Sequence, residues 1–187
     1  MKDATVVAKA SEASAKSEAA SVSPVKALVE EGVAARYTRK DAAEARGAWE
    51  KAMARLEEPG VTPMDRYQVY AGLGLLHAEA KEYGRARDLF KQAVAASREI
   101  TDNFKPLSYS HYNLACAEAL LGDRDAALAD LRAALEAERK TERRRYVKLA
   151  RTDDSLASLK DEPRYRSLLE EFAESPDAAA AKPKSGP

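Results

Sequence analysis

The sequence predicts an all-α fold: a solenoid of helix-turn-helix repeats, with three repeats and an incomplete fourth unit that closes the array. Two observations lead to this class. Ala, Leu, Glu, Arg and Lys dominate the middle of the 187-residue chain, and no alternation of β-branched residues between turn residues indicates a strand. Apolar and small residues also recur at one fixed spacing, which is typical of a repeat architecture.

The spacing of the recurring residues is 41 positions. Large apolar side chains keep this step at Trp49, Phe90, Leu131 and Phe172. Three columns of small residues keep the same step: Ala45, Ala86 and Ala127; Ala52, Ala93 and Ala134; and Val33, Gly74 and Ala115. Because four columns agree on one period, we expect each unit to be one structural module that stacks on the next.

The small residues are expected to have a packing role. Two antiparallel helices approach closely where the side chains between them are small. We therefore expect Gly74 to face the crossing near Ala86, and Ala93 to let the next repeat pack against this one. Phe90 is expected to fill the space left between them.

Each repeat is expected to contain two helices. The best-defined pair carries Tyr70-x2-Leu73-Gly74-x2-His77 and then Tyr83-x2-Ala86-x3-Phe90-x2-Ala93. The corresponding segments are 29–36 and 45–52 in the first repeat, and 111–118 and 127–134 in the third, where a Leu121-Gly122-Asp123 turn joins them.

Proline marks where later helices begin. The segments 53–65 and 95–108 hold extra residues between repeats, and Thr62-Pro63 and Lys105-Pro106 are expected to start the next helices. At the end of the chain, Asp161 or Glu162 can cap a helix that starts at Pro163. Its apolar stripe predicts a closing helix and consists of Tyr165, Leu168, Leu169 and Phe172.

These segments resemble the tetratricopeptide repeat, whose pattern is W-x2-L-G-x2-Y on a first helix and A-x3-F-x2-A on a second. The match is best in the second repeat, where His77 takes the place of the tyrosine. The resemblance covers residues 24–174. It implies a superhelix of helix pairs that acts as a non-enzymatic adaptor or scaffold and binds a protein or peptide in its concave groove. The units are longer than the usual length of about 34 residues.

The resemblance also implies which side chains line the concave groove. The first helices would present a mainly aromatic and apolar surface, made of Tyr37, Gln68, Ala71, Leu75, Glu79, Tyr109, Tyr112, Asn113, Cys116 and Leu120. Tyrosine suits peptide binding because it offers contact area at low entropic cost. The alternative is that Tyr109 and Tyr112 pack against the preceding repeat. The clamp of Lys, Asn and Arg found in chaperone-binding members of the family is not reproduced, so we do not expect chaperone binding of that kind.

The composition indicates which kinds of binding partner and which cellular compartment to expect. The chain has 31 Lys and Arg residues against 31 Asp and Glu residues, which argues against nucleic acid or an anionic membrane as the main partner. Cys116 is the single cysteine, and neither a signal peptide nor a run of about 20 apolar residues is visible. We therefore predict a cytoplasmic protein, with residues 1–23 and 175–187 as disordered tails. Self-association stays open.

No constellation of residues predicts an enzyme. His77 and His111 have no second ligand at metal-binding spacing and are expected to pack against neighbouring residues. Cys116 has no nearby base, no phosphate-binding loop occurs, and acidic pairs such as Asp153-Asp154 are typical of a solvated surface. We therefore expect no cofactor, no metal and no small-molecule substrate.

One charged stretch offers an alternative binding surface. Basic residues gather near the end of the array, at Arg139, Lys140, Arg143, Arg144, Arg145, Lys148 and Arg151. They form either a docking site for an acidic partner or a nucleic acid, or a solvated helix face.

Overall fold

A computed structural model describes residues 24–101, 106–139 and 145–173 of the chain. The described ranges contain helices and no strand, which confirms the all-α prediction. In chain order the elements are α2 (Pro24–Val33), the π-helix η1 (Ala34–Arg39), α3 (Ala42–Met53), α4 (Pro63–Glu79), α5 (Tyr83–Glu99), α6 (Leu107–Leu121), α7 (Arg124–Arg139), α8 (Arg145–Thr152), the 3-10 helix η2 (Asp154–Leu159) and α9 (Pro163–Ala173).

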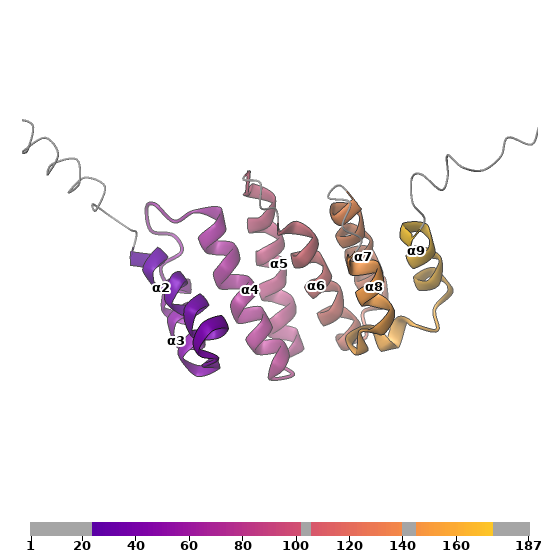
Figure 1. The fold of residues 1–187 in the computed structure, drawn as a ribbon, viewed down its shortest axis with the longest axis horizontal. Helices are drawn as coiled ribbons and strands as arrows, with labels where there is room; N and C mark the ends of the chain where they lie inside the picture. Colours follow the sequence, from indigo (N-terminus) through magenta and orange to yellow (C-terminus); the bar gives the residue numbers. More distant parts are fainter. Residues whose placement is uncertain (1–23, 102–105, 140–144, 174–187) are drawn as a thin grey trace, which may run out of the picture.

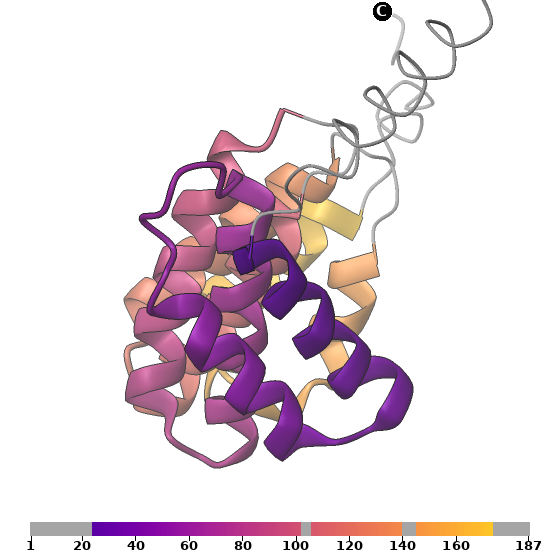
Figure 2. The same cartoon turned by 90° about the vertical axis from the view of Figure 1, so that its left-hand side faces the viewer.

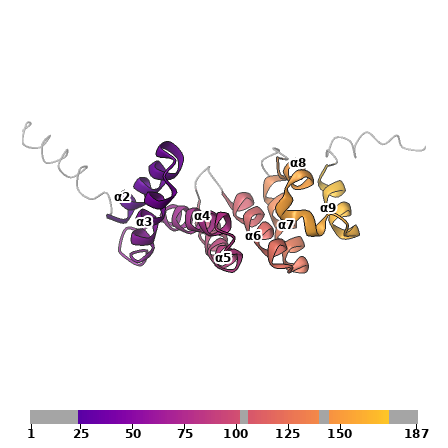
Figure 3. The same ribbon diagram turned by 90° about the horizontal axis from the view of Figure 1, so that it is seen from below.

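Consecutive helices pack side by side and form a row that runs from α2 and α3 to α9 (Figure 1). Each helix from α2 to α7 contacts the next one along the chain, and α2 also contacts α4. The same order is visible from below (Figure 3), and a view from the α2 end places α2 and α3 in front of the later helices (Figure 2). None of the helices within the described ranges has the length and apolar character needed to cross a bilayer.

The helix ends follow the sequence signals. Thr62 caps α4, since its Oγ1 accepts a hydrogen bond from the Asp65 backbone N–H at 3.1 Å, while the Asp65 carboxylate accepts one from the Thr62 N–H at 2.9 Å. Pro63 is the first residue of α4, and Pro106 directly precedes α6. Both proline-marked starts are therefore confirmed. Gly122 ends α6 with a φ of 83°, a left-handed conformation that favours glycine.

The repeated columns are buried except at Val33, which is half-buried. The alanines at 45, 86 and 127 and at 52, 93 and 134 are all 0% exposed. The column of large apolar residues, Trp49, Phe90, Leu131 and Phe172, is buried as well. The core therefore runs along the row as a series of apolar clusters. Each large side chain of the 41-residue period fills the space that the small residues leave.

Glycine makes room for two of these large side chains. Trp49 lies between Gly32 of α2 and Gly72 of α4, and a Cβ atom on either glycine would lie 2.3 Å or 2.6 Å from the indole ring. A Cβ atom on Gly74 would lie 2.6 Å from the Phe90 ring. Gly74 thus lies where α4 packs on α5, and the Phe90 ring fills the space next to it, as predicted.

The C-terminal unit closes the row as the sequence indicates. Helix α9 begins at Pro163, and its predicted stripe of Tyr165, Leu168, Leu169 and Phe172 is buried. The Tyr165 hydroxyl donates a hydrogen bond to the Ala150 carbonyl at 2.5 Å, which joins α9 to α8. The predicted tails, 1–23 and 175–187, lie outside the described residues.

Candidate functional site

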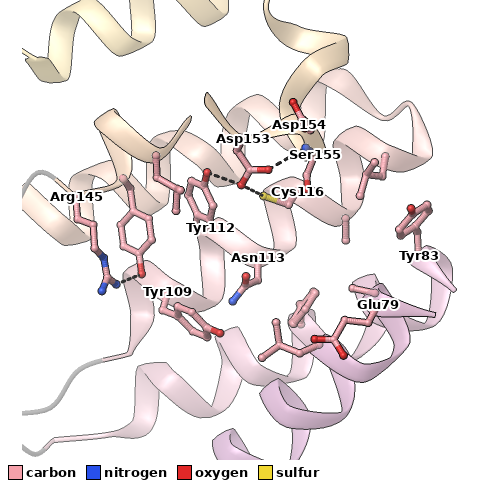
Figure 4. Close-up of a pocket in the computed structure, with 17 residues that line it drawn as sticks. Glu79, Tyr83, Tyr109, Tyr112, Asn113, Cys116, Arg145, Asp153, Asp154 and Ser155 are labelled. Atoms are coloured by element: carbon pink, nitrogen blue, oxygen red, sulfur yellow. Dashed lines mark hydrogen bonds between the residues drawn. The ribbon is translucent and has the colours of Figure 1, made fainter. Parts of the chain in front are cut away.

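A cavity of about 690 Å³ opens in the second half of the row (Figure 4). Its walls come from the C-terminal end of α4, the start of α5, one face of α6, and the segment α8–η2. The lining is mainly aromatic and aliphatic, with a few charged groups at its edges. Concave apolar sites with few polar groups are typical binding sites for ligands and peptides.

Most residues predicted for the groove meet in this cavity. Those that line it are Leu75, Glu79, Tyr109, Tyr112, Asn113, Cys116 and Leu120. Tyr37 does not: it is 52% exposed and lies on the π-helix η1, where the angular spacing of an α-helix does not apply. Gln68 is half-buried on α4, about 10 Å along the helix from Leu75, and does not line the cavity either. Ala71 is buried.

The wall formed by α8 and η2 was not predicted from the sequence. This wall contributes Arg145, Tyr146, Leu149, Asp153, Asp154 and Ser155. A signal was present, because Tyr146, Leu149 and Asp153 follow the i, i+3, i+7 spacing of one helix face. From the sequence, the same segment was interpreted through its basic residues, Arg145, Lys148 and Arg151, rather than through this apolar face.

The two tyrosines of α6 pack in different directions. The Tyr112 ring stacks on that of Tyr146, with the centroids 4.7 Å apart and an angle of 27° between the planes. Tyr109 is half-buried and packs against the apolar cluster that contains Tyr67 and Ala93 of the preceding repeat, as well as against the C-terminal cluster. The alternative prediction, packing against the preceding helices, therefore holds for Tyr109, while Tyr112 packs against Tyr146 of the following segment.

Asp153 is the polar centre of the cavity wall. Its Oδ2 accepts a hydrogen bond from the Tyr112 hydroxyl at 2.9 Å and one from the Cys116 thiol at 3.8 Å, while its Oδ1 accepts one from the Ser155 N–H at 2.9 Å (Figure 4). Asp153 is half-buried, so its assignment to a solvated acidic pair is wrong, whereas Asp154 is exposed as expected. The last bond caps η2 and fixes the carboxylate at the end of α8.

Burial controls the acid–base behaviour of the donors. Burial, together with the negative charge of Asp153, raises the pKa of the Cys116 thiol well above its usual range. The same two causes, with Cys116 as a further contributor, raise the pKa of Tyr112. Both groups are therefore protonated at neutral pH and act as hydrogen-bond donors, and Cys116 carries no thiolate for nucleophilic attack.

Arg145, Glu79 and Asp154 are further charged residues that line the cavity. The Arg145 guanidinium lies 4.6 Å above the centroid of the Tyr146 ring and also bonds the Tyr146 hydroxyl. Glu79 forms an ion pair with Arg36, and Asp154 lies 3.9 Å from the Lys160 ammonium.

The described residues of the basic stretch have different surroundings. Arg145 lines the large cavity, whereas Arg151 lines a separate depression of about 270 Å³ next to Tyr165. Lys148 is exposed and lines neither. Arg139 is the last residue of α7, and Lys140, Arg143 and Arg144 lie outside the described residues.

A second group of ionisable residues is buried outside the cavity. The His111 Nδ1 lies 2.5 Å from an Asp130 carboxylate oxygen, and Glu118, 2% exposed, lies on the same face of α6. Burial and the charge of Asp130 raise the pKa of Glu118 to about 8. His77 is paired with Glu82 at 2.5 Å. Among the described residues, no group of three or more His, Cys, Asp or Glu side chains is placed to hold a metal ion.

Comparison with known proteins gives no family for the chain. No protein-family model matches it, and neither a curated protein nor a solved structure matches it.

Proposed function

We propose that this chain is a tetratricopeptide-like repeat array and a non-enzymatic interaction module that binds a linear segment of a partner protein. One observation carries the proposal: an open cavity of about 690 Å³ lined mainly by tyrosine and aliphatic side chains. Such a surface binds peptides because aromatic side chains gain contact area and lose little conformational entropy. The buried 41-residue columns support the repeat array.

The chemistry of the cavity favours binding over catalysis. Its single thiol is protonated, and the hydroxyl of Tyr112 is already committed to Asp153. The aliphatic groups Leu120 and Leu149 stand at its edge with 39% and 41% of their surface exposed. Exposed leucines next to tyrosine rings are the kind of surface that a partner covers.

The alternative function, an acidic or nucleic-acid partner on the basic stretch, is supported by no contact of the described residues. Arg145 lines the large cavity, Arg151 lines the smaller depression and Lys148 lines neither, so neither of these two concave sites contains all three. The cytoplasmic location indicated by the single cysteine stays a prediction.

Two neighbouring leucines of α6 test the proposal. Leu120 and Leu121 are 39% and 43% exposed, but Leu120 lines the cavity and Leu121 does not. Proteins captured from a native lysate by the wild-type chain are identified by mass spectrometry, and overlapping synthetic peptides of each are then titrated by fluorescence polarisation. We expect Leu120→Glu to weaken the binding of a captured peptide at least about tenfold, because the charge would be desolvated in the bound state.

Leu121→Glu is the matched control and is expected to bind as the wild type does. Circular dichroism of both variants checks that the helices are intact. Equal binding by the two variants, or the absence of any bound peptide, would overturn the proposed function.

A further inference from the structure

Two side chains of opposite charge, Arg145 and Asp153, lie at the two ends of the cavity. Arg145 is the first residue of α8 and Asp153 directly follows its last residue, so the two are separated by the length of this helix. With a rise of about 1.5 Å per residue, the Cα atoms of Arg145 and Asp153 are about 12 Å apart along the helix axis, and this is the spacing of the two backbone positions from which the charges extend. Figure 4 shows Arg145 at one side of the cavity and Asp153, Asp154 and Glu79 towards the other.

The positive end is held in place by an aromatic ring. The Arg145 guanidinium lies over Tyr146, which itself stacks on Tyr112. Within the described ranges, no carboxylate forms an ion pair with this guanidinium. An arginine ordered on an aromatic face keeps free N–H donors for a carboxylate that arrives with a ligand.

The negative end is also ordered before any ligand binds. Asp153 is fixed by the Tyr112 hydroxyl, the Cys116 thiol and the Ser155 N–H, all of which donate to it. No Lys, Arg or His of the described residues forms an ion pair with Asp153. Glu79 and Asp154 line the same part of the cavity but are paired with Arg36 and Lys160, so Asp153 is the carboxylate of this end that a basic group of a ligand would meet.

The surface between the two ends is apolar. It is formed by the aliphatic side chains of Leu149, Leu120 and Leu75 and by the tyrosine rings of α6. A ligand that spans the cavity therefore needs apolar groups in its middle and charges at its ends. In an extended peptide, which rises about 3.3 Å per residue, a separation of about 12 Å corresponds to about four positions.

On the basis of the proposed function, we propose that the cavity selects a peptide segment with two opposite charges about four residues apart. A carboxylate of the segment pairs with Arg145, a basic side chain faces Asp153, and apolar side chains lie between them. The two ends of α8 thus define both the spacing and the direction of the bound segment, because a reversed charge order would place like charges together.

The test uses an array of acetylated, amidated peptides about ten residues long, made of mixed Ala, Leu, Tyr, Ser and Gln positions. Each peptide carries one Arg and one Asp, in both orders and at every spacing. We expect the full-length chain to retain peptides with one charge order and a spacing near four. In titrations of the best peptide, replacing Arg by its neutral analogue citrulline, or Asp by Asn, is expected to weaken binding at least about fivefold.

Variants of the protein assign each effect to one end of the cavity. In Asp153→Asn, which keeps the capping geometry, the difference between Arg and citrulline is expected to disappear. In Arg145→Gln, the difference between Asp and Asn is expected to disappear. Lys148→Gln is the control, because Lys148 lies on α8 outside the cavity and loses the same charge as Arg145.

The outcomes separate this inference from the proposed function. Peptides that bind through Leu120 without any preference for charge or spacing would overturn the inference and leave the proposed function in place. A preference for acidic peptides alone would also overturn it. If no peptide binds, both fail. The citrulline and Asn peptides test the wild-type chain directly, so the result does not depend on the folding of a variant.

Discussion

The contact between Trp49 and Gly72 provides a sharp test of the packing that orders the first three helices. Trp49 of α3 lies against Gly72 of α4, and a Cβ atom on that glycine would lie 2.6 Å from the ring. Non-bonded carbon atoms rest at about 3.5–4.0 Å, so Gly72→Ala creates an overlap of roughly 1 Å. The indole is buried and has little space to move.

The expected magnitude follows from two opposing terms. Overpacking a core costs about 1–3 kcal/mol, while alanine in place of glycine inside a helix stabilises it by about 1 kcal/mol. We therefore expect Gly72→Ala to lower the free energy of unfolding by up to about 2 kcal/mol. Gly47 provides the matched control, because it lies inside α3 with nothing within 4 Å of a Cβ atom. Gly47→Ala is expected to raise the free energy of unfolding by about 1 kcal/mol.

Urea unfolding measures both changes. Trp49 is the single tryptophan, so its fluorescence reports on the contact itself, and circular dichroism follows the helices of the whole chain. The free energies of unfolding of the two variants are expected to differ by about 1–3 kcal/mol, with Gly72→Ala the less stable of the two. If Gly72→Ala is as stabilising as Gly47→Ala, Trp49 does not pack against α4 and the stacking of the first repeat on the second is wrong.

Three further predictions concern a buried acid, a helix cap and the thiol. Because the pKa of Glu118 in the folded chain is raised from 4.5 to about 8, its contribution to stability is full below the lower value and is lost as pH rises through the higher one. Glu118→Gln is therefore expected to flatten the fall in melting temperature between about pH 5 and pH 9, and an unchanged pH profile would contradict this. Thr62→Ala removes the acceptor for the Asp65 N–H and is expected to cost about 1 kcal/mol in urea unfolding, against about 0.5 kcal/mol or less for the exposed Thr38→Ala. Burial raises the pKa of Cys116, so Ellman's reagent is expected to modify it slowly at neutral pH in the folded chain and rapidly in urea; equal rates would contradict the raised pKa.

The helical packing was predictable because the columns report steric requirements that are local to each pair of helices. An alanine column and a large-residue column at one period specify where helices touch, and these positions are buried in every unit. The starts at Pro63 and Pro163 were predictable for the same reason, since proline restricts the backbone before it wherever it occurs. The pairing of Gly32 and Gly72 with one indole ring was not, because these two glycines are 40 positions apart and share no column.

The part of the cavity wall formed by α4 and α6 was predicted from the sequence, and the part formed by α8 and η2 was not. The resemblance to the tetratricopeptide repeat assigned Tyr109, Tyr112 and Cys116 of α6 to one face, and all three line the cavity. Tyr37 does not line it, and residues 34–39 form π-helical turns, which the periodicity of the sequence does not indicate. Which part of a helix face borders the cavity depends on how the helices are arranged in three dimensions. Gln68 is an example, because it lies on α4, as Leu75 does, but outside the cavity.

The site lies where the repeat period breaks. Tyr112 and Asp153 are 41 positions apart, so they occupy the same column in successive units, and they are joined by a hydrogen bond of 2.9 Å. A regular fourth unit would place a full helix at this position, but the chain has the eight-residue α8 followed by the 3-10 helix η2. Because η2 begins one residue after Asp153, the carboxylate turns back towards α6 and α8 stands apart as the second wall of the cavity. The regular columns thus explain how the row of helices is held together, and the departure from them explains why a cavity opens in its second half.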